Sequence, residues 1–178
     1  MTADEFLAFP EAPFRYQLVE GELIVNEPKL PHQIAVTNLL TALKRWIDDG
    51  RARGFVSSPA DFRFDDRNIY APDVWWVREE RKPQAGQLDL DGLPDLVVEC
   101  RSPSTWRYDV GRKRTYYEQA AIAELWLVDT ASHSVLVCRR SSAASPTFDV
   151  EPELDAGAGL TSPMLPGFSL PVGDVFRI

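Results

Sequence analysis

The run Leu96-Val97-Val98 is the most continuously apolar strand candidate of the chain, and it ends on an acidic residue, Glu99. Because apolar residues occupy both faces of such a strand, the run predicts a strand buried in the centre of a sheet. A carboxylate at the end of a buried strand is costly to desolvate unless it is paired or binds a cation. The run therefore predicts both a central strand and a place where charge must be neutralised.

A second apolar run, Val74-Trp75-Trp76-Val77, follows directly after Pro72-Asp73, so it also begins beside a carboxylate. If the two strands are neighbours, Asp73 and Glu99 can reach one hard cation through oxygen ligands. Such a cation lowers the pKa of a bound water and screens the charge of a phosphate under attack. Spacing alone leaves two alternatives open: a metal site, or ordinary strand-flanking acids, with Asp73 capping a turn.

The N-terminal part of the chain predicts a helix and then a hairpin. Thr2 and Glu5 have capping-box spacing, and Pro10 and Pro13 are expected to end this short helix. Two short apolar-rich runs follow, at residues 16–19 and 22–25. They are joined at Glu20-Gly21, which indicates a tight hairpin turn.

Two further helices are expected. The clearest one ends before Gly50, since its apolar residues recur three or four positions apart. These residues are Val36, Leu39, Leu40, Leu43 and Ile47. The other helix is predicted over residues 109–121, with arginine and lysine on one side and an apolar opposite side. That opposite side holds Tyr116, Tyr117 and Ala120.

The remaining segments complete an α/β pattern. Short strands are expected at residues 55–58, 61–64, 125–128 and 135–138. Residues 65–68 are predicted to form a turn, and residues 79–91 a loop. The tail after Ser141 is expected to wrap the core without a large element. The simplest architecture is a mixed β-sheet flanked by helices, an α+β arrangement in one domain over residues 1–178, with the N-terminal helix and hairpin as an extension.

Composition indicates the class of protein and its cellular location. The chain is 44% hydrophobic and 26% charged, which is typical of a globular protein with one core. No apolar run approaches the roughly 20 residues that a bilayer requires, and Asp4 and Glu5 stand where a secretory signal needs positive charge. A cytoplasmic location without membrane contact is therefore expected. Cys100 and Cys138 lie in predicted strands and are expected to be buried free thiols.

Several ordered motifs resemble the Uma-type restriction endonucleases of the PD-(D/E)XK nuclease superfamily. Pro72-Asp73 followed by Glu99-Cys100-Arg101 resembles the short superfamily signature. The Uma-type family is matched more widely, in order from Asp4 to Phe176. The matching segments are residues 16–23, His32, residues 71–74, 94–99 and 102–104, Asp109 with Lys113 and Tyr117, and residues 124–129, 161–163 and 165–167.

The resemblance implies a restriction-endonuclease-like core and an endonuclease activity. In such a protein Mg²⁺, with Mn²⁺ as an alternative, is held by Asp73 and Glu99, and a metal-activated water hydrolyses phosphodiester bonds of DNA. Glu22 is then a third acidic contributor, or else a solvent-facing strand residue. By analogy with this superfamily, a homodimer is expected, because a duplex has two strands to cut.

One position departs from the superfamily pattern. Arg101 stands where the signature has lysine, two residues after Glu99. Arginine stays protonated, so it cannot shuttle a proton, although it can hold a phosphate oxygen. The resemblance implies that the catalytic lysine comes instead from the following helix, as Lys113. The other interpretation of Lys113 is a member of the solvated basic run Arg112-Lys113-Arg114.

Other residues support the same site less specifically. His32 is expected to contact substrate or metal, or to satisfy a local backbone group as most lone histidines do. Tyr117 lies one helical turn after Lys113 and is expected mainly to pack on the sheet. The basic stretch with Arg101 and Arg112 is the best candidate for a phosphate-contacting surface. Trp75, Trp76 and Trp126 are predicted in the core or in a subunit contact.

The net charge of −8 keeps other functions open, because nucleic-acid affinity rests on positive charge. The leading hypothesis is a Mg²⁺-dependent endonuclease. The first alternative is a catalytically inactive nuclease-fold protein that binds nucleic acid or acts as a regulatory subunit. A nuclease-fold subunit that works only with a partner is a further alternative, since no separate recognition domain is evident.

Overall fold

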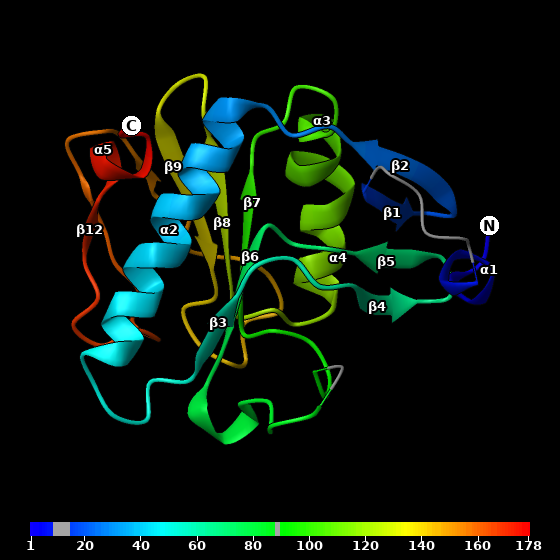
Figure 1. Ribbon diagram of the computed structural model, residues 1–178, viewed down its shortest axis with the longest axis horizontal. Helices are drawn as coiled ribbons and strands as arrows, with labels where there is room; N and C mark the ends of the chain where they lie inside the picture. The colour runs from blue at the N-terminus through cyan, green and yellow to red at the C-terminus, as the bar shows by residue number, and fades with distance from the viewer. Residues whose placement is uncertain (9–14, 88–89) are drawn as a thin grey trace.

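The computed structural model describes residues 1–8, 15–87 and 90–178, and its centre is a six-stranded sheet (Figure 1). The strand order is β10-β9-β8-β7-β6-β3. Neighbouring strands are antiparallel except for β7 and β8, which are parallel, so the sheet is mixed as predicted. The bounds are β3 (Phe55–Ser57), β6 (Val74–Val77), β7 (Leu96–Cys100), β8 (Glu124–Asp129), β9 (Ser134–Arg139) and β10 (Glu153–Leu154).

Successive side chains of each strand point to opposite faces of the sheet, and helices cover both faces. Leu96 and Val98 of β7 pack with α2 (Leu30–Asp48) in one apolar cluster. Val97 belongs to the opposite cluster, with Tyr117 of the second helical segment. That segment consists of α3 (Trp106–Tyr108), a π-helical turn η2 (Asp109–Lys113) and α4 (Arg114–Gln119). Figure 1 shows β6 to β8 between the two helical layers.

The second helical segment differs from its prediction in two ways. Helical structure begins at Trp106, three residues before the predicted Asp109, because Ser102 O accepts the backbone N–H of Trp106 and starts the turn early. It also contains the π turn, which apolar periodicity cannot reveal. A π turn is rare and is frequently found at functional sites. Here Asp109 and Lys113 stand at its two ends.

A smaller four-stranded sheet has the order β2-β1-β5-β4. The predicted hairpin is confirmed: Glu20 and Gly21 both have positive φ, 52° and 81°, as a tight two-residue turn requires. Its strands are β1 (Arg15–Val19), β2 (Glu22–Asn26), β4 (Phe62–Asp65) and β5 (Asn68–Tyr70). Strand β5 was not predicted, because its strand character depends on the pairing of Ile69 with Leu18, which is distant in sequence.

The two ends of the chain are attached differently. The predicted capping box of Thr2 and Glu5 is present at α1 (Ala3–Leu7), whereas Pro10 and Pro13 lie outside the described residues. The tail forms only β11 (Gly159–Leu160), β12 (Leu170–Pro171) and α5 (Val172–Val175), as expected. It places five apolar side chains in the α2 cluster, namely Leu160, Leu165, Phe168, Val172 and Val175.

Several smaller expectations can be compared with the structure. Cys100 and Cys138 are buried free thiols, and the three tryptophans Trp75, Trp76 and Trp126 are buried in the core. The predicted loop after β6 begins with a short 3₁₀ turn, η1 (Glu79–Arg81). No helix within residues 1–8, 15–87 and 90–178 is long and apolar enough to span a bilayer.

Candidate active site

Asp73 and Glu99 lie beside each other on neighbouring antiparallel strands. Val74 of β6 pairs with Val98 of β7, so the residue before Val74 stands opposite the residue after Val98. Both carboxylates are buried, with 3% and 2% of their surface exposed. Oδ2 of Asp73 accepts the backbone N–H of Cys100 at 2.8 Å, which ties the two strand ends together. The two strands are therefore neighbours, which is the condition for both carboxylates to reach one cation.

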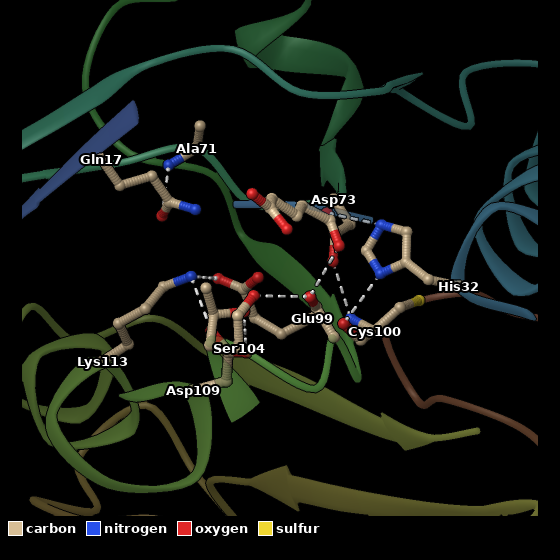
Figure 2. Close-up of polar contacts among 12 residues, drawn as sticks. Gln17, His32, Ala71, Asp73, Glu99, Cys100, Ser104, Asp109 and Lys113 are labelled. Carbon is tan, nitrogen blue, oxygen red and sulfur yellow. Dashed lines mark hydrogen bonds and ion pairs between the residues drawn. The ribbon is translucent and has the colours of Figure 1, made fainter. Parts of the chain in front are cut away.

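Lys113 completes this pair from the helical side. Its side chain is 2% exposed, so the solvated-run interpretation is wrong. Nζ lies 2.5 Å from Oε1 of Glu99 and 2.9 Å from Oδ1 of Asp109. Figure 2 shows Asp73 and Glu99 between Lys113 on one side and His32 on the other. The structure thus brings the helix lysine to the strand carboxylates, although Lys113 and Glu99 are 14 positions apart in sequence.

Tyr117 packs against other aromatic rings, as expected, and also donates a hydrogen bond to Glu99. Its ring contacts Phe64 and Tyr70, with ring centroids 5.3 and 5.7 Å away. Its hydroxyl donates a hydrogen bond to Oε1 of Glu99. Burial beside Glu99 raises the pKa of the tyrosine hydroxyl well above its ordinary value, so Tyr117 stays a donor.

His32 reaches the site from the first turn of α2. Nδ1 lies 3.1 Å from the carbonyl oxygen of Cys100, and Nε2 lies 3.4 Å from Oδ1 of Asp73. Two oxygen neighbours favour a ring that carries protons on both nitrogens. Burial lowers the pKa of His32, but the contact with Asp73, the carbonyl of Cys100 and the charge of Glu99 together outweigh it, so the pKa is raised overall.

A groove opens beside this histidine and gives the site access to solvent. Its volume is about 330 Å³. It runs along the first turns of α2 and past Ser58 and Pro59, with His32 and Asp73 in its wall. The two residues are therefore buried and yet reachable from outside.

The charges of the site do not balance within the protein. Three buried carboxylates, Asp73, Glu99 and Asp109, face two cations, Lys113 and the protonated form of His32. Burial raises the pKa of Glu99 to about 8 and also raises the pKa of Asp109, so protons make up part of the deficit. A bound divalent cation would supply positive charge in place of these protons.

The donor set fits a hard divalent cation by its chemistry. Carboxylate oxygens are the ligands that Mg²⁺ and Mn²⁺ prefer, and Oε2 of Glu99 accepts no hydrogen bond from the described residues. Within the described part of the chain, no three His, Cys, Asp or Glu side chains already form a metal-holding group.

Three predicted site residues lie elsewhere. Glu22 is exposed and faces Arg112, whose Nη1 is 3.6 Å from Oε2 of Glu22 and whose Nε is 3.0 Å from Oε2 of Glu20. Arg101 binds both carboxylate oxygens of Asp129 at 2.9 Å. Among the described contacts, none of the three residues touches Asp73, Glu99 or Lys113.

Two residues of the site carry no role in the sequence analysis. Asp109 is the third buried carboxylate, and the signal that could have found it is its i,i+4 spacing to Lys113. Gln17 of β1 is buried, and its Oε1 accepts the backbone N–H of Ala71 at 3.2 Å, two residues before Asp73 (Figure 2). No local pattern marks Gln17, because its partner comes from another strand.

Comparisons with known proteins agree with this fold. A crystal structure described as "a putative nuclease belonging to DUF820", from Anabaena variabilis ATCC 29413, has the same fold with a TM-score of 0.81. The two chains share 20% sequence identity, and the match covers 99% of this chain and 97% of that chain. No curated protein matches this chain significantly. The model of the Uma2 family, described as "Putative restriction endonuclease", matches residues 3–173, so this chain belongs to that family.

Proposed function

We propose that this protein is a divalent-metal-dependent endonuclease that hydrolyses phosphodiester bonds of DNA. The observation that carries the proposal is the buried group of Asp73, Glu99 and Lys113 at one end of the sheet. Membership of the restriction endonuclease family supports a nuclease, and the charge deficit supports Mg²⁺ or Mn²⁺ as the cofactor. Asp73 and Glu99 would hold the cation. When bound, it would lower the pKa of a water and screen the scissile phosphate.

The side chains around the carboxylates have separate tasks in this proposal. The ammonium of Lys113 lies where it can stabilise negative charge on a phosphate oxygen or give a proton to a leaving oxygen. The hydroxyl of Tyr117 donates a hydrogen bond to Glu99 and orients it. His32 contacts Asp73 and the carbonyl oxygen of Cys100. Arg101 and Arg112 are 35% and 47% exposed and remain candidates for contacts with more distant phosphates.

The test separates metal binding from catalysis. Wild type, Asp73→Asn, Glu99→Gln and the double variant are titrated with Mg²⁺ and Mn²⁺ by calorimetry, and cleavage of supercoiled plasmid is followed in parallel. Isosteric amides remove the charge and keep the volume, so the fold is expected to persist. The matched control is Asp48→Asn, which removes an exposed carboxylate of α2.

The expected result is metal binding and plasmid nicking by wild type and by the control. The single variants should bind metal more weakly, and the double variant should neither bind nor nick. Metal binding by the double variant would show that the metal site lies elsewhere in the protein. Wild type that binds no metal would leave the carboxylates with a structural role only.

A non-catalytic nuclease-fold protein is the second candidate. It is favoured by Arg101, which stands at the signature lysine position and is held by Asp129. It is also favoured by the contact of Lys113 with Glu99. This candidate predicts DNA binding without cleavage at any Mg²⁺ or Mn²⁺ concentration. Gel-shift and plasmid assays on the same preparation distinguish the two functions.

The homodimer expected for cleavage of both strands is also a proposal. It rests on the two-strand geometry of a DNA duplex. Sedimentation equilibrium with and without duplex DNA tests it. A single-chain mass in both conditions, together with nicking in place of double-strand cleavage, would contradict it.

A further inference from the structure

A second hollow lies at the other end of the sheet from Glu99. Its volume is about 550 Å³, and it is bordered by the end of β6, the starts of β7 and β8 and the end of β9. Asp95 precedes β7, and Glu99 is four residues further along the same strand, which corresponds to about 13 Å. The hollow is therefore separate from the candidate active site.

Four arginines gather around this hollow on a chain whose net charge is −8. They are Arg78, Arg81, Arg139 and Arg140. The acidic residues of the same wall are Asp95 and Glu124. Guanidinium groups thus outnumber carboxylates two to one, which is a local excess of positive charge on an acidic protein.

Both carboxylates of the wall are already committed to other partners. Oδ1 of Asp95 lies 3.0 Å from Nη2 of Arg78 and 3.4 Å from Nη1 of Arg81, so a single carboxylate pairs with two guanidinium groups. The oxygens of Glu124 accept hydrogen bonds from Trp126 Nε1 at 2.6 Å and from Ser162 Oγ at 2.8 Å. Glu124 stands opposite Arg139 in the β8–β9 register, and the charge of Arg139 acts on it, but burial raises the pKa of Glu124 and no ion pair joins the two side chains among the described residues.

Arg139 and Arg140 keep their positive charge toward the hollow. Arg140 donates only to main-chain carbonyl oxygens, those of Glu118, Ile122 and Ser145, which fixes its guanidinium without cancelling its charge. Arg139 has no carboxylate within ion-pair distance in the described part of the chain. Both residues border the hollow, and guanidinium groups can bind phosphate oxygens in a bidentate manner through their planar N–H pairs.

The rest of the wall is apolar and completes a ligand pocket. It includes Ala120, Ile122, Ala123, Pro94, Leu93 and Met164. Pockets of this volume hold small organic ligands, with apolar walls for the body and a few polar groups for orientation. We propose that this hollow binds a nucleoside phosphate, with the phosphate on Arg139 and Arg140 and the base or sugar against the apolar wall. The ligand is a free mononucleotide or the 5′-phosphorylated end of a strand.

Calorimetry in EDTA tests the proposal without any metal at the other site. The probes are thymidine 5′-monophosphate, inorganic phosphate and a 5′-phosphorylated octathymidylate. The first variant is Arg139→Gln, since no hydrogen bond or ion pair of this side chain is found among the described residues. The control is Arg177→Gln, an arginine that is 78% exposed on the C-terminal segment. Glu99→Gln is the third variant, since it alters the candidate active site alone. Melting temperatures confirm that each variant is folded.

The expected result is saturable binding of the mononucleotide that Arg139→Gln weakens about tenfold or more, while Arg177→Gln and Glu99→Gln leave it unchanged. Equal affinity for the octamer assigns the pocket to a strand end, and much weaker affinity assigns it to a free nucleotide. The proposal is overturned if no probe binds, if Arg139→Gln has no effect, or if inorganic phosphate binds as tightly as the mononucleotide.

Discussion

Glu99 and Lys113 are buried against each other, with Nζ of the lysine 2.5 Å from Oε1 of the glutamate and each side chain almost fully removed from water. Oδ1 of Asp109 lies 2.9 Å from the same lysine nitrogen. A buried pair of this kind costs free energy to desolvate, and it is weak evidence for stability by itself. In the proposed endonuclease, this pair would instead serve catalysis beside Asp73.

Replacing Lys113 should separate metal binding from cleavage. In Lys113→Gln we expect plasmid nicking to fall to background while Mg²⁺ still binds, because Asp73 and Glu99 remain. Removal of one buried partner should also destabilise the metal-free protein by about 3 kcal/mol, and Mg²⁺ should restore part of this loss. Urea unfolding and calorimetry measure both effects. The control Lys44→Gln, on the exposed face of α2, should change neither.

Asp109 should act as a positioning residue for Lys113. Its charge raises the pKa of that lysine, against burial, which lowers it. Asp109→Asn should therefore lower the lysine pKa, so that the alkaline limb of the pH–rate profile moves to lower pH, with kcat reduced more than KM. An unshifted profile with uniformly reduced activity would instead indicate a purely structural role. The exposed aspartate variant Asp48→Asn provides the baseline profile.

The stability of the metal-free protein should decrease as the pH rises toward 8. Burial raises the pKa of Glu99 to about 8 from its ordinary value of 4.5. Between these two values the unfolded chain has released the proton that the folded protein still binds, so a rise in pH favours unfolding. Urea unfolding in EDTA at pH 5, 6, 7 and 8 should show this slope in wild type. The slope should be smaller in Glu99→Gln, and saturating Mg²⁺ should reduce it in wild type.

Tyr117→Phe should reveal the hydrogen bond to Glu99. The variant removes only the hydroxyl and leaves a buried acceptor with one partner fewer, which costs about 1–3 kcal/mol. The neighbouring Tyr116→Phe is the matched control, since no hydrogen bond of its hydroxyl is found among the described residues. Denaturant unfolding of both variants measures the difference. Equal losses would assign the contribution of Tyr117 to packing alone.

Gly54 should tolerate no side chain, in contrast to Gly86. Both have positive φ, 81° and 89°, so alanine is strained at either position by about 1 kcal/mol. A Cβ at Gly54 would lie 2.0 Å from the carbonyl oxygen of Val77, whereas one at Gly86 would meet nothing within 4 Å. Gly54→Ala should therefore lose several times more stability than Gly86→Ala, measured by thermal unfolding. Similar losses in the two variants would show that β3 can shift away from β6.

Local sequence patterns were sufficient for most elements. The apolar run before Glu99 predicted a central strand, and β7 lies between β6 and β8 with every residue buried. The hairpin at Glu20-Gly21 and the long helix before Gly50 were also predicted, because a positive-φ turn and a 3.6-residue period are local properties. Asp73 and Glu99 could be named as a pair because each stands at the end of an apolar strand.

Tertiary structure decided what surrounds that pair. Strand β5 exists because β1 pairs with it, and the π turn between Asp109 and Lys113 has no apolar signature. Lys113 and Arg112 are adjacent basic residues, yet one is buried against Glu99 and the other pairs with Glu20 at the surface. Sequence by itself therefore determined which strands carry the carboxylates. Which cation and which third carboxylate face them depended on how the second helical segment packs on the sheet, since burial and charge neutralisation arise only between segments distant along the chain.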